Sequence, residues 1–273
     1  MCEECGCAVG TGVVEVRTGH GTHTHHHAGP ESVEVLTGIL RQNDHEAAHN
    51  REHFDAQGVF AVNLMSSPGS GKTSLLEATI EALGGRYRIA VIEGDLETEN
   101  DARRIRDKGV PAVQIITGQT CHLDARMVHD ALHALDLSDI DILFIENVGN
   151  LVCPAGFDLG QHANVALLSV TEGDDKPAKY PVMFRGADLV LLSKTDILPV
   201  FDDFSPERAE RHVRELANPA PVLQVSARDA GRLAGWIDWL EEGIAARRAA
   251  PRPAAGAHHH HHHHHHHHAR AAS

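Results

Sequence analysis

The sequence predicts an α/β fold in which helices cover both faces of a mostly parallel sheet. Short apolar runs alternate with segments of helical periodicity from Val59 to about Arg248, which is typical of right-handed β-α-β units. Carboxylates follow several of these runs, at the strand ends where parallel sheets bind their ligands. Aromatic residues make up only 4% of the chain, so aliphatic side chains must fill the core.

Composition divides the chain into four segments. Residues 1–30 are rich in cysteine and histidine, so we expect a disordered tail that can bind metal but cannot build a core. Helical spacing followed by a polar stretch predicts a helix or linker over residues 31–58. The α/β domain spans residues 59–248, and residues 249–273 form a second disordered tail. Its eleven consecutive histidines, His258–His268, are either a purification tag or a low-affinity native store of Ni²⁺ or Zn²⁺.

Within the α/β domain, apolar runs predict the strands and periodic segments predict the helices. The expected strands cover residues 59–65, 88–93, 113–117, 142–145, 188–192 and 222–225. The expected helices cover residues 72–84, 98–108, 122–136, 206–217 and 231–247.

The loop between the first strand and the first helix has the pattern of a phosphate-binding loop. It reads Ser-Ser-Pro-Gly-Ser-Gly-Lys-Thr from Ser66 to Thr73, and departs from Gly-x4-Gly-Lys-Ser/Thr only at Ser66. Small residues let backbone N–H groups converge on an anion at a helix N-terminus. Lys72 supplies a cation for the outer phosphates, and Thr73 offers a hydroxyl to Mg²⁺. We therefore predict a P-loop that binds a nucleoside triphosphate through Gly69, Ser70, Gly71, Lys72, Thr73 and Ser74.

A second motif favours guanine over adenine. The strand over 188–192 leads into Ser193-Lys194-Thr195-Asp196, which resembles Asn-Lys-x-Asp with serine in place of asparagine. Asp196 can accept from both donors on the Watson–Crick edge of guanine, whereas adenine would leave the carboxylate unpaired. Lys194 can lay its methylene stem along the base. The loop with Ser226 and Ala227 is placed to cover the far side of the base.

Two further strand ends carry candidate catalytic groups. Asp95 and Glu146 are placed to hold Mg²⁺ or to orient an attacking water, with Lys72 as the third catalytic candidate. Gly149 could donate its N–H to a γ-phosphate. We interpret Glu97, Glu99 and Asp101 as an acidic first helical turn rather than as site residues.

The chain has five cysteines, an odd number that argues against a disulfide scaffold. With no signal peptide and no apolar stretch of membrane length, the sequence predicts a cytoplasmic protein. Cys2, Cys5 and Cys7 lie beside a free amine, and these donors suit square-planar Ni²⁺ or tetrahedral Zn²⁺. The alternative is three unpaired thiols at a frayed terminus.

The remaining cysteines follow predicted strands of the sheet. Cys121 and His122 come after the strand over 113–117, at the expected helix start, and Cys153 lies four residues beyond Gly149. Each of these residues taken singly is more often structural than a metal ligand. Together, Cys121, His122 and Cys153 would tie a metal site to a nucleotide-sensitive loop.

These motifs in combination resemble those of the HypB family of GTPases, which help to load nickel into NiFe hydrogenase. The matching segments are Cys-x-x-Cys-Gly-Cys, the phosphate-binding loop, Glu-Gly-Asp, Cys-His-Leu-Asp and Glu-Asn-Val-Gly-Asn-Leu-Val-Cys-Pro. The resemblance spans about residues 33–247 and the first seven residues. It implies a P-loop NTPase of the SIMIBI class that forms a homodimer with GTP bound. It also implies a small nickel-binding, HypA-like accessory protein and the hydrogenase large subunit as partners.

The resemblance implies two metal sites as well. High-affinity nickel binding is implied at Cys2, Cys5 and Cys7, and a second nickel or zinc site is implied at Cys121, His122 and Cys153.

Charge excludes some functions, and three rival functions stay open. A net charge of −14 provides no basic surface for nucleic acid or an anionic membrane. The rivals are a urease-type accessory GTPase, a nickel store with a secondary GTPase core, and a P-loop kinase. The three N-terminal cysteines disfavour the first, and the guanine motif argues against the third.

Overall fold

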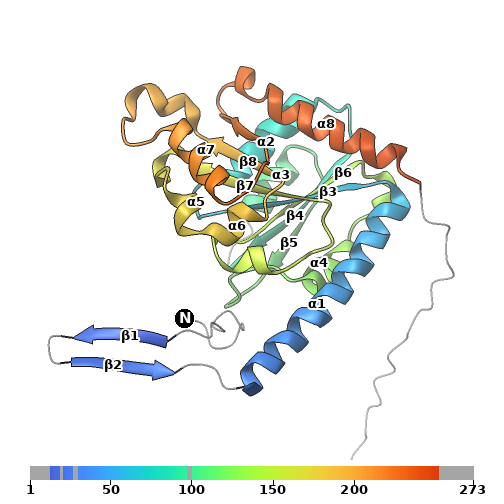
Figure 1. Ribbon diagram of the computed structural model, residues 1–273. Coiled ribbons are helices and arrows are strands. Elements are labelled where there is room, and N and C mark those ends of the chain that lie inside the picture. The colour runs from blue at the N-terminus through green and yellow to red at the C-terminus, as the bar shows by residue number, and fades with distance from the viewer. Residues whose placement is uncertain (1–12, 19–20, 27–29, 97–99, 252–273) are drawn as a thin grey trace, which may run out of the picture.

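The computed structural model describes residues 13–18, 21–26, 30–96 and 100–251 (Figure 1). Its main sheet has seven strands in the order β5-β4-β6-β3-β7-β8-β9, and every neighbouring pair is parallel. The strands are β3 (Phe60–Ser66), β4 (Ile89–Asp95), β5 (Ala112–Ile116), β6 (Ile142–Glu146), β7 (Ala163–Ser169), β8 (Leu189–Ser193) and β9 (Val222–Gln224). The predicted α/β class with a parallel sheet is confirmed.

Helices cover both faces of this sheet. They are α1 (Pro30–Gln57), α2 (Lys72–Leu83), α3 (Asn100–Asp107), α4 (Ala125–Leu132), α5 (Lys176–Lys179), α6 (Pro181–Arg185), α7 (Pro206–Glu215) and α8 (Ala234–Ala249). Side chains of α2, α3 and α8 pack on one face, and those of α1, α4, α6 and α7 pack on the other. Short 3-10 helices lie at Leu137–Asp139, Cys153–Gly156, Val170–Glu172, Thr195–Val200 and Ala230–Arg232.

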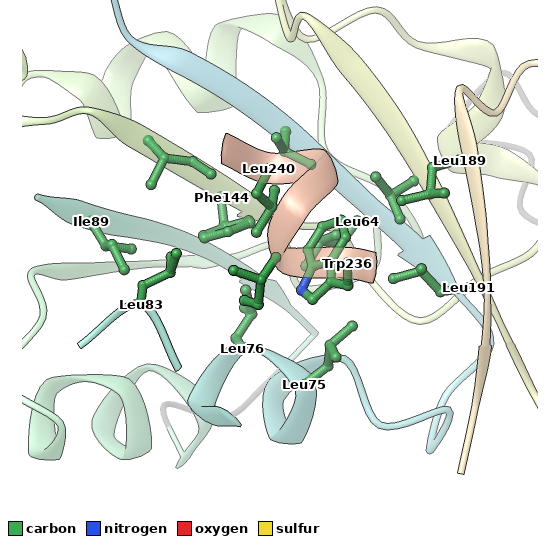
Figure 2. Packing of buried hydrophobic residues seen from close by; sticks show 14 of the residues in the cluster. Leu64, Leu75, Leu76, Leu83, Ile89, Phe144, Leu189, Leu191, Trp236 and Leu240 are labelled. Atoms are coloured by element: carbon green, nitrogen blue, oxygen red, sulfur yellow. The ribbon is translucent and has the colours of Figure 1, made fainter. Parts of the chain in front are cut away.

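The central strand β3 shows why two layers of helices are needed. Its side chains alternate, so Val62 and Leu64 enter the core beneath α2 and α8 while Ala61 and Met65 enter cores on the opposite face. Trp236 of α8 is fully buried in the first of these cores, near Leu64 of β3 and Leu75 and Leu76 of α2 (Figure 2). Its indole N–H donates to Thr79 Oγ1 of α2 at 2.8 Å, so the one polar atom of the ring is satisfied.

The boundaries differ from expectation in informative places. The helix expected over 122–136 begins only at Ala125, because the Asp124 side chain accepts the Met127 N–H and caps it. The Cys121-His122 pair therefore lies in the turn before the helix. Strand β7, which the sequence analysis did not single out, joins β3 to β8 and so lies near the middle of the sheet.

A separate antiparallel pair lies near the N-terminus. It consists of β1 (Val13–Thr18) and β2 (Gly21–His26). The sequence analysis expected no regular structure there, and the difference follows from the β-branched valines and threonines in both segments, which favour extended backbone. Among the described residues, no helix combines the length and the apolar character that crossing a membrane requires.

Candidate functional site

The site begins at the loop between β3 and α2. Gly69 and Gly71 have φ of +73° and +97°, a backbone conformation that residues with a Cβ adopt only with strain. Gly71 is also the N-cap of α2, and no side chain caps the helix there. The first-turn N–H groups of α2 are thus left to bind an anion, as the sequence predicts for a phosphate loop.

Both departures from the consensus motifs have structural roles. Ser66 Oγ accepts from Lys72 Nζ at 3.1 Å and also from Ser70 Oγ, so it holds the lysine and the loop in place. Ser193, which replaces the expected asparagine, donates from Oγ to Ser70 O at 2.7 Å. Each serine therefore supports the phosphate loop from within its own motif.

A cleft of about 500 Å³ opens above this loop. One wall is the phosphate loop from Pro68 to Ser74, except for the fully buried Ser70, and another is the segment Glu93–Leu96 at the end of β4. Asp101 and Arg104 of α3, the segment after β6 and Lys194 complete the lining. The cleft thus gathers the predicted phosphate-binding and catalytic residues at the carboxyl edge of the sheet.

Buried charges meet at the base of the cleft. Thr73 Oγ1 donates to Glu146 Oε1 at 3.0 Å, and Lys72 Nζ lies 4.0 Å from the same oxygen. Glu93 and Asp101 bring their carboxylates within 4.8 Å of Glu146. Asp95 ends β4 on the cleft wall, where its Oδ1 accepts the Leu96 N–H at 2.7 Å.

Three carboxylates and one lysine leave an excess of buried negative charge. Burial and the charge of Glu146 raise the pKa of Glu93 far above its ordinary value. Burial also raises the pKa of Glu146, although Lys72 opposes this shift. Glu93 therefore carries a proton at neutral pH in the absence of an added cation.

This arrangement fits Mg²⁺. Apart from the proton that the two carboxyls share, Glu93 Oε2 and Glu146 Oε2 are buried and accept no hydrogen bond from the described residues, and hard divalent cations take oxygen ligands. Thr73 and Asp95 are the residues that would hold the ion, with Glu146 and Glu93 beside them. Bound there, the ion would neutralise phosphate charge and favour the ionised form of both glutamates.

The guanine motif lies at the end of β8. Lys194 has φ of +59° and donates from Nζ to Gly69 O at 2.7 Å, so its stem runs along the phosphate loop. Asp196 accepts at Oδ1 from Ser226 Oγ at 2.7 Å, which orients the carboxylate. Ala227 follows Ser226 in the same loop. The structure thus brings the two predicted base-binding segments together.

The inner cysteines and His122 also meet. The sulfurs of Cys121 and Cys153 lie 2.8 Å apart, and Cys121 Sγ is 3.9 Å from His122 Nδ1. His122 is buried and stacks on Phe157 with 3.9 Å between ring centroids. Burial lowers the pKa of His122, which favours the neutral imidazole that binds metal. A tetrahedral ion would need the sulfurs about 3.8 Å apart, so binding would spread them by about an ångström.

A short series of contacts joins this cluster to the cleft. Asn147, directly after Glu146, accepts at Oδ1 from Leu123 N at 3.1 Å and from Val148 N at 3.0 Å. Leu123 follows His122 in the chain. The Leu123 side chain packs so closely against Gly94 that a Cβ atom added to Gly94 would lie 2.8 Å from it. Gly149 packs on the phosphate loop, where a Cβ would lie 2.9 Å from the Pro68 backbone.

Sequence reasoning missed three parts of this site. Glu93 was overlooked because it is the last residue of the predicted strand over 88–93 and Asp95 lies just beyond that strand, yet a glutamate after four consecutive apolar strand residues was a signal of a buried charge. Asp101 does lie in the first turn of α3, as interpreted, but it also lines the cleft. Asn147 carried no sequence signal that separated it from its neighbours.

Cys2, Cys5 and Cys7, the histidines His258–His268, and Glu97 and Glu99 lie outside the described residues.

Comparisons with known proteins agree with this geometry. Residues 60–224 match the family model described as CobW/HypB/UreG, nucleotide-binding domain. The chain is 56% identical to hydrogenase maturation factor HypB of Azotobacter vinelandii, with 78% of this chain and 70% of that protein covered. It is 48% identical to the HypB of Escherichia coli strain K12, with 83% and 79% covered. The crystal structure of HypB from Helicobacter pylori in complex with nickel is similar with a TM-score of 0.72 and 43% identity, and covers 75% of this chain and 96% of that chain.

Proposed function

The chain belongs to the HypB hydrogenase maturation factors of the CobW/HypB/UreG family, and on this basis we propose that it is a GTP-hydrolysing nickel metallochaperone. It delivers Ni²⁺ for NiFe hydrogenase, and its nucleotide state controls metal binding at Cys121, His122 and Cys153. The observation that carries this proposal is the hydrogen bond from Leu123 N to Asn147 Oδ1, which joins the metal-binding turn to the segment after Glu146.

The nucleotide is GTP, recognised through Asp196 and Lys194 with Ser226 and Ala227 beside the base. The proposal is supported by the Ser226–Asp196 hydrogen bond, which aims a carboxylate as guanine requires. Gly149 approaches the phosphate loop closely enough for its N–H to bind the γ-phosphate.

Hydrolysis uses Lys72, Asp95 and Glu146 and is slow. Lys72 binds the outer phosphates, and the carboxylates of Asp95 and Glu146 orient the attacking water or support Mg²⁺. Arg104 on the cleft wall donates to Glu77 and Asp101, so it is held in place by carboxylates rather than left to reach the transferred phosphoryl group. Without an arginine at that group, a large part of GTPase catalysis is missing.

The metal sites take borderline cations. Cys121, His122 and Cys153 bind Ni²⁺ or Zn²⁺ and offer three ligands, one fewer than a closed tetrahedral shell. Cys2, Cys5 and Cys7 form the tighter nickel site, supported by the chemistry of three thiolates beside an amine.

We place the fourth ligand of the inner site in a GTP-bound homodimer of the SIMIBI type. Val152, beside Cys153, is 58% exposed, and Ile116 at the end of β5 is 56% exposed. Exposed apolar side chains at this edge favour a protein partner. A HypA-like accessory protein and the hydrogenase large subunit are the further partners. Cys121 and Cys153 are not joined by a disulfide, which suits the reducing cytoplasm.

Parallel titrations of the full chain test the proposal. GTP turnover is measured against ATP turnover, and Ni²⁺ binding is measured in the wild type and in the Cys121→Ala and Cys153→Ala variants. We expect GTP turnover well above ATP turnover and a loss of one Ni²⁺ equivalent in each variant. Equal turnover of ATP and GTP would contradict the guanine assignment. Nickel delivery that survives Lys72→Ala would favour a nickel store over a GTPase.

A further inference from the structure

Helices α1 and α4 pack side by side (Figure 1). Four histidine rings lie close together at this contact. His49 and His53 lie one helical turn apart on α1, and His129 and His133 have the same spacing at the end of α4. Residues at i and i+4 share a face of a helix, so each pair presents two imidazoles in one direction. This arrangement is separate from the Cys121, His122 and Cys153 cluster, and no motif of the sequence analysis includes it.

The rings are close enough to share one ion. Ring centroids lie 4.5 Å apart for His49 and His53, 5.0 Å for His49 and His129, and 5.8 Å for His53 and His129. One nitrogen from each of these three rings lies within 4.8 Å of the others. A tetrahedral or octahedral ion with imidazole ligands needs about 3–3.4 Å between nitrogens, which side-chain rotation at three half-buried residues can supply. His133 lies 5.0 Å from His129, centroid to centroid, as the nearest fourth ring.

A buried asparagine fixes the orientation of the central ring. Asn50 donates from Nδ2 to Ala125 O at 2.8 Å and to Leu159 O at 3.1 Å, so its Oδ1 must be an acceptor. His129 Nδ1 lies 3.1 Å from that oxygen and is therefore the protonated nitrogen. Its Nε2 keeps a lone pair. Metal-binding histidines are oriented in this way, with the second ring nitrogen donating to an oxygen of the protein.

Charge around the cluster also suits a cation. Burial and the neighbouring His49 and His133 lower the pKa of His129, so the ring is neutral at neutral pH. Glu46 and Asp130 lie near enough to affect the same ring electrostatically and are negative.

We propose that His49, His53 and His129 form a binding site for a borderline divalent transition ion, Zn²⁺ or Ni²⁺, that clamps α1 to α4. Imidazole nitrogens without thiolates suit these ions and discriminate against Mg²⁺, which prefers oxygen. The site lies on the helix that follows the Cys121-His122 turn, so an ion there would stiffen the support of the inner metal site. The proposal does not depend on GTP hydrolysis.

Residue-level labelling of the full chain tests this site without interference from other metal ligands. Histidines are modified with diethyl pyrocarbonate and quantified by peptide mass spectrometry, with no metal, Zn²⁺, Ni²⁺ or Mg²⁺. We expect Zn²⁺ or Ni²⁺ to slow modification of His49, His53 and His129 by about tenfold. This is the rate that remains when the metal occupies about 90% of the sites and only the metal-free site reacts. Mg²⁺ should have no effect, and His212 on α7 serves as an internal control because its ring pairs with Glu215 away from the cluster.

Two ligand variants complete the test. His129→Gln and, independently, His49→Gln should abolish protection of the remaining histidines, whereas His212→Gln should preserve it. The melting temperature of each variant without metal shows whether it is folded. Two independent variants are used so that the test still stands when one of them does not fold. If His49, His53 and His129 react at the same rate with and without Zn²⁺ and Ni²⁺, the rings only pack against one another and the proposal is wrong. It is also wrong if protection at His49 and His53 persists in His129→Gln.

Discussion

The nucleotide cleft and the cluster of Cys121, His122 and Cys153 lie at the same edge of the sheet but differ in completeness. In the cleft, Lys72, Thr73 and Glu146 are buried, and Glu146 accepts a hydrogen bond from Thr73 and pairs with Lys72. The phosphate loop is held by serines from two motifs. The cluster of Cys121, His122 and Cys153 offers three candidate metal ligands, and Val152 beside it is exposed.

The difference indicates which region should change with nucleotide state. A preformed cleft can bind its ligand with little rearrangement, whereas an incomplete metal shell needs another donor or a moved loop. The contacts of Asn147 and Gly149 connect the two, so a nucleotide can bias the metal site through packed atoms rather than through long-range effects. The following predictions test this contrast.

Replacement of Lys72, the cationic side chain at the base of the cleft, should have the largest effect. Lys72→Ala leaves Glu146 buried without its lysine and removes a donor to the phosphates, so we expect GTP turnover to fall by about 10³-fold or more. The matched control is Lys108→Ala, an exposed lysine paired with Glu81, which should retain turnover. Phosphate release measures the effect, and a variant with wild-type turnover would show that the cleft is not the GTPase site.

Base specificity should change next in size. In Asp196→Asn an amide replaces the acceptor for two guanine donors, so we expect GTP affinity to fall by about 10²-fold or more and xanthosine triphosphate to gain affinity. Ser226 can still donate to the asparagine oxygen, which preserves the loop. Fluorescent-nucleotide competition reads the change, with exposed Asp202→Asn as the control. Unchanged preference in Asp196→Asn would place the base elsewhere.

Stability against pH should show the smallest effect. The pKa of Glu93 is higher in the folded protein than in the unfolded chain, so folding favours the protonated carboxyl. Its contribution to the free energy of unfolding is fully present below about pH 4.5 and is lost as the pH rises towards the folded-state pKa. Glu93→Gln removes that loss, and we expect it to raise the Tm of the nucleotide-free protein by about 2–4 °C at pH 8 and by little at pH 4.5.

The same change should weaken binding of Mg²⁺ with GTP, because a neutral amide replaces a carboxylate beside the ion. Thermal melts across pH measure the stability effect, with the exposed Glu242→Gln as the flat control. A Glu93→Gln variant that is less stable than the wild type at pH 8 would contradict the buried, protonated carboxyl.

Local patterns predicted the parts of the molecule that are local in sequence. The phosphate loop, its strand and its helix are contiguous, so Ser66 to Thr73 could be interpreted without knowing the sheet order. The parallel sheet and its helices followed from alternation of apolar runs. Even the meeting of Cys121 with Cys153 could be expected, because both follow strands whose carboxyl ends share one edge.

Features that depend on packing between distant segments could not be predicted. The hydrogen bond from Leu123 N to Asn147 Oδ1 and the close approach of Gly149 to Pro68 depend on the register of β6 with β3 and β4. The start of α4 at Ala125 depends on the cap at Asp124, so His122 lies before the helix rather than in its first turn. The histidines of α1 and α4 meet only through helix packing.

The most direct test of the central claim is metal affinity in the two nucleotide states. The chain has five cysteines, so replacing Cys2, Cys5 and Cys7 by alanine leaves only Cys121 and Cys153 to give a thiolate-to-metal absorption band. Titrating that protein with Ni²⁺ and Zn²⁺, with GDP and with a non-hydrolysable GTP analogue, should show affinities that differ by about 5–150-fold. Asn147→Ala in the same background should shrink the difference, since it removes the acceptor for Leu123 N. Equal metal affinities with GDP and with the GTP analogue, in the protein that retains Asn147, would contradict control of metal binding by the nucleotide. Cys121, His122 and Cys153 would then form a site independent of the nucleotide.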